Sequence, residues 1–404
     1  MNKKGRFGDL FDFYICSGSI NSPSQMDAWL DTLSANPLGW FVIGLSLLGL
    51  MIQLYYHWGI FGKSVAPSSP LNSSLEPVSV VVSARNEERN LIELVPIIME
   101  QDYPQFELIV INDSSWDDTM SVLKAFTLRY SNLHIVTIDE EKQHMQGKKF
   151  AITLGIKAAK YERILLTDAD CRPKSNQWIR EMAQGLNDKH QIVLGYSPYQ
   201  TQPGWLNKMI RFDTLGIGGF YLGAAKIGTP YMGVGRNLAY QKELFFRVGG
   251  FKNHFRLASG DDDLFVNQVA SAHNTITVFA PSAQTLSFPK ENWSSWFKQK
   301  RRHFTTSPYY KASHRRMLGF WPFSFLLMAS ALLLSAWIPA AIIVSGGLFI
   351  LREISYMIAL NVLCSRLGER KDIVWLAIPL EFQLHCTNVL LAMANLIRKP
   401  QKWS

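Results

Sequence analysis

The chain has 404 residues and a formal net charge of +9; 48% of its residues are hydrophobic and 18% are charged. Soluble domains average about 25% charged residues, so this composition, with a mean hydropathy of +0.01, indicates a mixture of soluble and membrane segments. The many aromatic residues exclude an intrinsically disordered chain. Four scattered cysteines without a CxxC pair exclude a disulfide scaffold and a structural zinc site, and we expect them to be reduced thiols.

Residues 38–58 form the first strong pattern, because they contain no Asp, Glu, Lys or Arg and carry aromatic residues at both ends. A transmembrane helix needs about 20 predominantly apolar residues, and aromatic residues concentrate where such helices meet the membrane surface. We therefore predict a transmembrane helix over 38–58. It follows an N-terminal segment, 1–37, to which no motif gives a role, and precedes a polar linker over 59–76.

Residues 77–290 then alternate β-branched runs with segments of helical spacing. We predict strands over 77–84, 106–113, 133–139 and 163–170, each followed by a helix or a turn. This alternation is typical of an α/β domain with a mostly parallel central sheet and flanking helices. Ligands bind such sheets at the carboxyl ends of the strands. No GxGxxG or GxxxxGK[ST] sequence lies at these turns, which disfavours a dinucleotide fold or a P-loop.

Polar side chains follow the first two strands. Taken alone, the residues after the first strand fit a helix N-terminus equally well, and the turn after the second favours a capped turn. The candidate binding residues at these two ends are Ser83, Ala84, Arg85, Glu87 and Asp113.

Asp168 and Asp170 come directly after the fourth apolar strand. Two like charges held close together need a cation to share, and hard divalent ions such as Mg²⁺ or Mn²⁺ bind carboxylates and bridge to phosphates. The sequence therefore predicts a metal–phosphate site here. Lys148, just upstream, would add positive charge near the same phosphates.

Asp261, Asp262 and Asp263 form a third acidic cluster, at the start of a segment with helical spacing. A helix N-terminus favours such charges without any chemistry. The functional alternative is a general base, because neighbouring carboxylates raise one another's proton affinity. We expect Asp263 to be the helix cap, which leaves Asp261 or Asp262 for chemistry.

Residues 291–316 are basic and aromatic and precede another apolar region, as expected of a helix lying on anionic headgroups. This placement also makes nucleic acid an unlikely partner class. Within the segment, Gln299, Arg301, Arg302 and His303 are polar enough to face a substrate pocket instead.

Residues 317–397 contain about three further apolar segments, and a basic tail follows over 398–404. Arg352 and Glu353 interrupt the middle segment, and we expect them to face protein or the membrane interface because lipid exposure of charge is costly. With four spans in all, the basic tail would lie opposite the soluble domain, against the positive-inside rule. The sequence therefore leaves the number of spans undecided by one helix.

Taken in order, the motifs SARNE, the Asp113 turn, DAD, GDD and QKRRH resemble the membrane-bound family 2 glycosyltransferases, which have a GT-A fold. Relatives of this kind include the cellulose and hyaluronan synthases and ceramide glucosyltransferase. The resemblance covers residues 77–310. His303 departs from it, because the family motif QxxRW has a Trp at that position.

The resemblance implies roles for individual residues. Ser83, Ala84, Arg85 and Glu87 would border the nucleotide, and Asp113 would contact its base. Asp168 would lie by the nucleotide and Asp170 would hold the metal. Asp261 matches the family's base under one alignment and Asp262 under another. The residues expected on the acceptor and diphosphate side are Gln299, Arg301, Arg302, His303 and Arg236.

The implied function is transfer of a sugar from a nucleotide-sugar, usually a UDP-sugar, to a hydroxyl acceptor with inversion, assisted by Mg²⁺ or Mn²⁺. A glycan or lipid acceptor in cell-envelope or glycolipid synthesis is expected. The enzyme would be a multi-pass protein of a bacterial inner membrane with its catalytic domain in the cytoplasm. The alternatives are a processive polysaccharide synthase, which the missing Trp disfavours, and an inactive scaffold, which the intact DAD and GDD clusters disfavour.

Overall fold

The computed structural model describes residues 36–64, 75–138, 147–257 and 259–397. It divides into two compact units, which are described separately. The helical unit contains described residues 36–54 and 320–354, and the main unit contains described residues 55–319 and 355–397. The predicted N-terminal segment 1–37, the linker 59–76 and the tail 398–404 lie largely outside the described residues.

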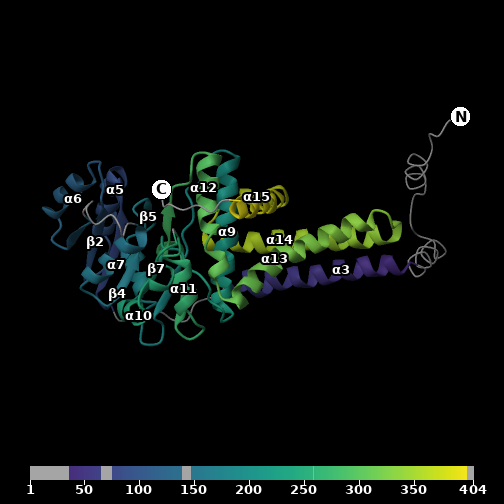
Figure 1. Ribbon diagram of the computed structural model, residues 1–404, viewed down its shortest axis with the longest axis horizontal. Helices are drawn as coiled ribbons and strands as arrows, with labels where there is room; N and C mark the ends of the chain where they lie inside the picture. The colour runs from purple at the N-terminus through teal and green to yellow at the C-terminus, as the bar shows by residue number, and fades with distance from the viewer. Residues whose placement is uncertain (1–35, 65–74, 139–146, 258, 398–404) are drawn as a thin grey trace. The chain divides into compact units, whose positions relative to one another are not determined.

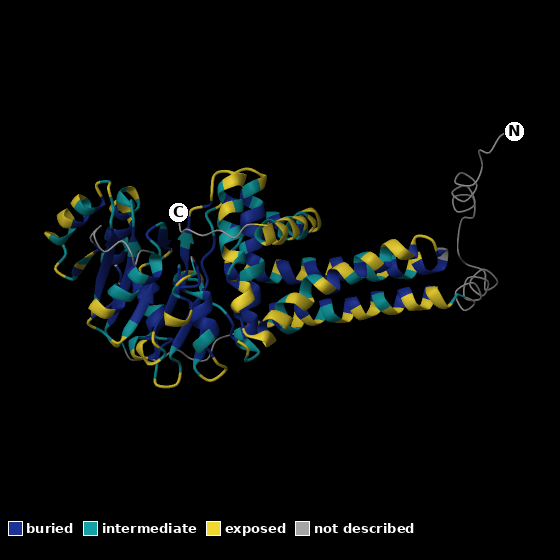
Figure 2. Ribbon diagram, in the orientation of Figure 1, coloured by how far each residue is buried: buried dark blue, intermediate teal, exposed yellow. Residues whose placement is uncertain are grey.

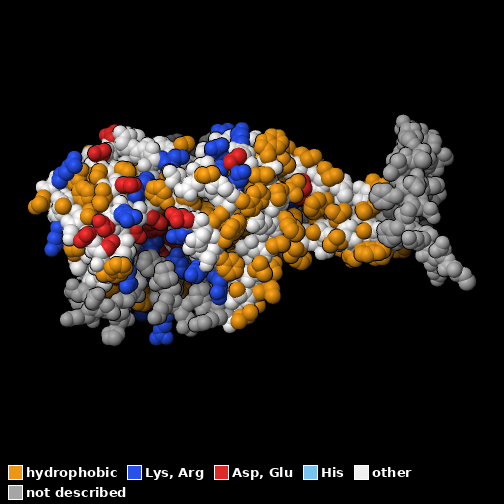
Figure 3. Space-filling model, turned by 90° about the horizontal axis from the view of Figure 1, so that it is seen from above, with side chains coloured by type: hydrophobic (Ala, Val, Ile, Leu, Met, Phe, Trp, Pro, Cys, Tyr) orange, Lys and Arg blue, Asp and Glu red, His pale blue; other side chains and the backbone are white. Residues whose placement is uncertain are grey.

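The helical unit is built from α3 (Pro37–Leu54) and from parts of α13 (Ala312–Ser335) and α14 (Pro339–Leu367) (Figure 1). Arg352 is fully buried there, where its guanidinium donates to Gln53 Oε1 at 2.8 Å and pairs with Glu353 at 2.8 Å. The expectation that Arg352 and Glu353 face protein is therefore confirmed. Hydrophobic side chains dominate the outer surface of these helices (Figure 3).

Among the described residues, three helices are long and apolar enough to cross a membrane: Pro37–Ser64, Ala312–Ser335 and Ala340–Leu367. The first joins α3 to η1 (Tyr55–Phe61) and α4 (Gly62–Ser64) without a break. The last predicted span forms α15 (Ala377–Ile397) but is not among the three. Polar residues such as Glu381 and Asn388 interrupt its apolar sequence, so the structure has one candidate span fewer than we predicted.

The main unit is organised around a seven-stranded sheet with the order β3-β2-β1-β4-β7-β6-β8. The strands β1 to β4 run parallel, with Val81 of β1 opposite Ile109 of β2 and Leu166 of β4. The strand β7 is antiparallel to both its neighbours, and β5 and β9 form a separate antiparallel pair. The strands are β1 (Val78–Ala84), β2 (Phe106–Asp113), β3 (Leu133–Ile138), β4 (Arg163–Leu166), β5 (Cys171–Pro173), β6 (Ile192–Gly195), β7 (Leu238–Gln241), β8 (Thr275–Val278) and β9 (Thr285–Ser287).

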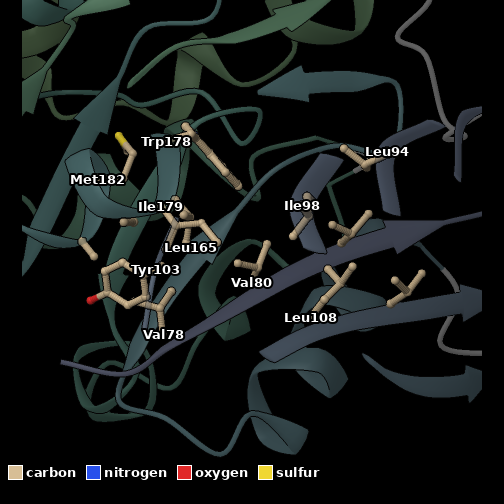
Figure 4. Packing of buried hydrophobic residues seen from close by; sticks show 14 of the residues in the cluster. Val78, Val80, Leu94, Ile98, Tyr103, Leu108, Leu165, Trp178, Ile179 and Met182 are labelled. Atoms are coloured by element: carbon tan, nitrogen blue, oxygen red, sulfur yellow. The ribbon is translucent and has the colours of Figure 1, made fainter. Parts of the chain in front are cut away.

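Alternate residues of the buried strands face opposite layers. Val80 and Leu108 pack with Leu94 and Ile98 in one core (Figure 4). On the other face, a Cβ added to Gly155 would lie 2.5 Å from Ile111, so only a glycine lets its helix approach this closely. In chain order, the helices of the main unit between β1 and residue 304 are α5 (Glu88–Met99), α6 (Thr119–Thr127), α7 (Lys148–Ala158), α8 (Trp178–Ala183), α9 (Trp205–Lys226), α10 (Lys242–Arg247), α11 (Asp263–Val269) and α12 (Trp293–Phe304). Figure 2 shows that the strands are buried and that exposed residues lie mainly on helices and loops.

Candidate active site

The turns after β1 and β2 are joined to each other by hydrogen bonds. Asn86 and Ser114 both have left-handed backbones, with φ of 57° and 52°. The Asn86 side chain accepts from the Trp116 amide at 3.0 Å, and the Asn86 amide donates to Ser115 Oγ at 3.0 Å. Asn tolerates this conformation better than most residues. The two turns therefore form one rigid edge at the carboxyl ends of the strands.

Asp113 ends β2 at this edge and is only 2% exposed. Its Oδ1 has no hydrogen-bond partner among the described residues. Burial raises the pKa of Asp113, and the nearby charge of Arg85 opposes that rise. An unpaired buried carboxylate oxygen is costly, so this oxygen can still accept a hydrogen bond. Ser83 and Ala84 lie at the end of the adjacent strand β1.

Asp168 and Asp170 lie in the turn between β4 and β5. Together with Cys171 they present three ligand atoms within 4.8 Å of one another. Burial and then the neighbouring charge of Asp168 raise the pKa of Asp170. Glu87 lies in the same electrostatic field, and burial is the largest cause of its raised pKa.

This acidic pair fits a hard divalent cation, because two close carboxylates carry unbalanced negative charge. The thiol of Cys171 is fully buried and lies 3.1 Å from Ser287 Oγ in a hydrogen bond. We therefore regard the two carboxylates, and not the thiol, as the metal-binding atoms.

Lys148 connects this turn to the third acidic cluster. It is the first residue of α7, and its Nζ lies 2.7 Å from Asp168 Oδ1 and 3.1 Å from Asp261 Oδ2. Burial would lower the pKa of Lys148, but the carboxylates of Asp168 and Asp261 raise it. The ammonium thus stays charged between two loops that are far apart in the sequence.

The three aspartates at the start of α11 have different surroundings. Asp262 is the N-cap and accepts from the Asp263 amide at 2.7 Å, so the expectation that Asp263 is the cap is wrong. Asp262 also accepts from the Gly235 amide at 2.7 Å. Asp263 instead accepts from the hydroxyls of Thr306 and Tyr310, at 2.5 and 2.6 Å. These bonds join α11 to the segment that follows α12.

The two candidate bases also differ in charge state. Burial would raise the pKa of Asp261, but the ammonium of Lys148 outweighs it and holds that pKa below its usual value. Burial, with the neighbouring charges of Asp261 and Asp263, raises the pKa of Asp262 to about 7. Asp261 is therefore ionised at neutral pH, whereas Asp262 titrates there.

Arg236 also lies near the turn that carries Asp168 and Asp170. Its Nη1 donates to Ser287 Oγ at 2.9 Å, and its guanidinium lies 4.6 Å from the centre of the Tyr199 ring. Asp168 and Asp170 are among the groups that interact with its charge. Gln299 of α12 forms a hydrogen bond with Tyr199. These contacts connect α12 to the turn that carries Asp168 and Asp170.

The other residues of α12 divide between the site and its supports. His303 is exposed and lies within electrostatic range of Arg236 and Asp261. Lys300 is buried and pairs with Asp213 of α9 at 2.8 Å. Arg301 donates to Asn395 Oδ1 and Ala394 O of α15, both at 3.1 Å, so this predicted site residue faces another helix. Arg302 is partly buried on the same helix.

Sequence reasoning missed Tyr199, Ser287 and Lys290, all of which lie beside the metal-binding turn. The charge of Lys290 acts on both Glu87 and Asp170. Tyr199 and Lys290 lie outside the helices and long strands and Ser287 ends the three-residue strand β9, and none of them belongs to a motif. Only the aromatic character of Tyr199 and the charge of Lys290 could have pointed to them. Figure 3 shows acidic and basic side chains gathered beside one another on the surface of the main unit.

A central sheet with carboxylates at its carboxyl edge, ordered in this way, is similar to that of the GT-A class of proteins. Residues 79–252 match the model of the family described as "Glycosyl transferase family 2". This part of the chain is therefore similar to the family 2 glycosyltransferases.

Two curated relatives match over the largest shares of the chain. The glycosyltransferase AglE of Haloferax volcanii is 26% identical over 215 residues, which cover 51% of this chain and 66% of the relative. The probable glycosyltransferase YdaM of Bacillus subtilis is 25% identical over 279 residues, covering 65% of this chain and 64% of the relative. The matches therefore span somewhat less than two thirds of these relatives.

One solved structure supports the fold. The mannosyltransferase PcManGT from Pyrobaculum calidifontis, solved with GDP-Man and Mn²⁺, aligns with a TM-score of 0.56 and 20% sequence identity. The alignment covers 80% of this chain and 98% of that chain. At this identity the likeness shows a shared fold.

Proposed function

We propose that this protein is an integral membrane glycosyltransferase that transfers a sugar from a nucleotide-sugar, with a UDP-sugar the expected donor, to a hydroxyl acceptor with inversion. The observation that carries the proposal is the contact of one ammonium, Lys148, with both Asp168 and Asp261, at 2.7 and 3.1 Å. It brings the diphosphate side and the base side of the reaction within a few ångströms of each other. An acceptor on a glycan or lipid, as part of cell-envelope or glycolipid synthesis, follows from the proposed membrane location.

The donor would lie along the carboxyl edge of the sheet. Asp113, with its unpartnered Oδ1, would accept a hydrogen bond from the nucleobase, and Ser83, Ala84, Arg85 and Glu87 would border the nucleotide. Asp168 and Asp170 would hold Mg²⁺ or Mn²⁺, which supplies charge neutralisation for the departing diphosphate. Lys148 and Arg236 add fixed positive charge to the same field.

We assign the general base to Asp261. Asp261 is ionised and pairs with Lys148, and its charge acts on His303. It does not cap a helix. Asp262, by contrast, accepts two backbone amides and holds the Gly235 loop. Asp261 would remove the proton of the acceptor hydroxyl as that oxygen attacks the anomeric carbon from the face opposite the diphosphate. Gln299, Arg302 and His303 of α12 would line the acceptor and diphosphate side.

The arrangement of charges supports a cytoplasmic main unit. With three spans, the end of the first at Ser64, the start of the second at Ala312 and the end of the third at Leu367 lie on the same side of the membrane. Basic residues flank these ends, whereas the connection at 336–339 has no charge and the nearest basic residue before the first span is Arg6. Because positive charge marks the cytoplasmic side, the proposed orientation places the basic tail on that side as well. The bacterial inner membrane remains our proposed location.

The test uses the purified full chain in lipid nanodiscs, with a panel of nucleotide-sugars and a lipid extract as the acceptor pool. We expect transfer, detected by mass spectrometry, in the presence of Mn²⁺ and its loss with EDTA. Asp170→Ala should lower transfer about 100-fold or more, since the charge on the leaving group is no longer balanced.

Asp188→Ala is the matched control, because Asp188 is an exposed carboxylate away from the site. It should leave transfer unchanged. Full transfer in EDTA, or by Asp170→Ala, would exclude the metal assignment. No nucleotide release with any donor would reject transferase activity itself.

A further inference from the structure

One side of α15 is apolar and exposed. Ile378, Phe382, Val389 and Met393 are 53, 66, 52 and 55% exposed. Their spacing of four, seven and four residues places them on one face of a helix with 3.6 residues per turn. Leu396 continues this face and is 87% exposed. Figure 2 shows exposed residues recurring along α15.

The other side of α15 is tied to the main unit. Leu380 and Leu391 are fully buried. Asn395 and Arg301 of α12 exchange hydrogen bonds, because Asn395 Nδ2 donates to Arg301 O and Arg301 Nε donates to Asn395 Oδ1, both at 3.1 Å. Trp205 at the start of α9 donates to Gln383. The apolar face is therefore turned outward by specific contacts on its opposite side.

Position in the chain limits what can cover this face. Only residues 368–376 separate α15 from Leu367, where the candidate span α14 ends. Nine residues reach at most about 30 Å, so α15 stays close to the membrane if α14 crosses it. Trp375, just before α15, is 80% exposed. Arg398, Lys399 and Lys402 follow it in the sequence.

An apolar helix face flanked by an aromatic residue and by Lys and Arg is the pattern of a helix that lies in the headgroup region of an anionic membrane. We propose that α15 lies on the cytoplasmic membrane surface with its apolar face inserted, and that it positions α12 through the Arg301–Asn395 contact. This inference rests on the proposed function in one respect, the proposal that the chain is a membrane protein. The contact of lipid with α15 does not depend on catalysis.

The test measures the depth of spin labels on α15 in the full chain, reconstituted into vesicles of phosphatidylcholine and phosphatidylglycerol. Labels are placed at Phe382→Cys or Met393→Cys, after Cys16 and Cys386 are replaced by Ser. Leu128→Cys, at a position 91% exposed on the main unit, is the aqueous control. Depth follows from the ratio of collisions with oxygen and with a water-soluble nickel chelate.

We expect both α15 labels to favour oxygen and to lie at the same shallow depth, while the label at 128 favours the nickel chelate. The two α15 sites are 11 residues apart, or about 16 Å along a helix. A depth difference approaching that length would show a spanning helix and overturn the proposal. If the nickel chelate reached the α15 labels as readily as the label at 128, the face would be exposed to water, which would also overturn the proposal. Labels that neither reagent reaches, with spin–spin coupling between two copies of the chain, would show that a second copy covers the face and would overturn it as well.

A second measurement tests the connection to α12. Asn395→Ala removes the exchanged bonds, and we expect the label depths to stay the same while the KM for the acceptor rises more than kcat falls. Asn388→Ala, on the same helix, is the matched control and should change neither constant. An unchanged KM in Asn395→Ala would reject the positioning role of α15. If no donor is ever transferred but the label depths are as expected, the proposed function fails and the membrane contact of α15 stands.

Discussion

Lys148 contacts two carboxylates from different loops, and its position gives the acidic residues of the site different roles. Asp168 and Asp261 share its charge, whereas Asp262 is bonded to backbone amides. A carboxylate that must accept a proton from the acceptor has to be ionised and free to approach it. This argument supports our proposal that Asp261 is the base and Asp262 a structural residue.

Replacing the two aspartates separately tests this division. Asp261→Asn should lower kcat by about 10²- to 10⁴-fold, the usual contribution of a general base, while donor binding measured by calorimetry is largely kept. Asp262→Asn should retain more of kcat than Asp261→Asn, because its one amide oxygen still accepts from one of the two backbone amides that Asp262 binds. The reverse pattern, with the large loss in Asp262→Asn, would move the base to Asp262.

Asp262 should also make stability depend on pH. Its pKa rises from 3.8 to about 7 through burial and the charges of Asp261 and Asp263. Between these values the native state binds more protons than the unfolded chain, so stability falls as pH rises across this window. Asp262→Asn removes this cost, and its melting temperature relative to the parent should be higher at pH 8 than at pH 5. Equal differences at both pH values would contradict the shift.

At the scale of elements, α9 supports the site through buried ion pairs on two sides. Asp213 pairs with Lys300 of α12 at 2.8 Å, and the fully buried Arg211 pairs with Glu369 and Asp372 at 2.6 and 2.8 Å. A buried pair adds little net stability, but removing one partner leaves an unbalanced charge. The position of α12 therefore depends on Asp213.

Asp213→Leu should destabilise the protein by about 3–5 kcal/mol, because the Lys300 ammonium then lacks its counter-charge. Asp213→Leu combined with Lys300→Met should recover most of that loss. Thermal unfolding of the purified variants measures both. Glu243→Gln, which breaks an exposed pair with Arg247, is the control and should cost less than about 1 kcal/mol. A double variant as unstable as Asp213→Leu would mean that packing, and not charge, is responsible.

The sequence pattern predicted the parallel half of the sheet within a few residues, since β1 and β2 are buried runs rich in Val and Ile and β3 and β4 are short apolar runs between polar segments. It missed β6, β7 and β8, which have four residues each and are too short to show a period. It also gave no prediction for α9, although that helix supports the site. Arg236 lies just before the antiparallel strand β7. Because β7 was not predicted, the contacts of Arg236 near Asp168 and Asp170 could not be predicted either.

The site itself was predictable where chemistry was concentrated in short motifs. Asp168, Asp170, Lys148 and Asp261 lie together as expected from their positions after strands and at helix starts. Arg301 was not predictable in the same way, because spacing along α12 does not tell which face meets α15. Residues from separate segments, such as Tyr199 and Ser287, come together only through tertiary structure.

At the scale of the molecule, the number of spans determines on which side of the membrane the C-terminal residues lie. Four spans conflict with the positive-inside rule, whereas the three candidate spans agree with it. The difference is α15, whose polar residues make it a poor span and whose contacts join it to α9 and α12. One helix of mixed composition thus determines the topology assigned to the whole protein.

The joined turns after β1 and β2 have a consequence for engineering. Asn86 and Ser114 adopt left-handed backbones in turns that bond to each other across the sheet edge. A chimera that takes the first turn from a relative would lose the partners of its backbone amides unless the second turn came with it. Changing the proposed donor site therefore means grafting both loops as one unit.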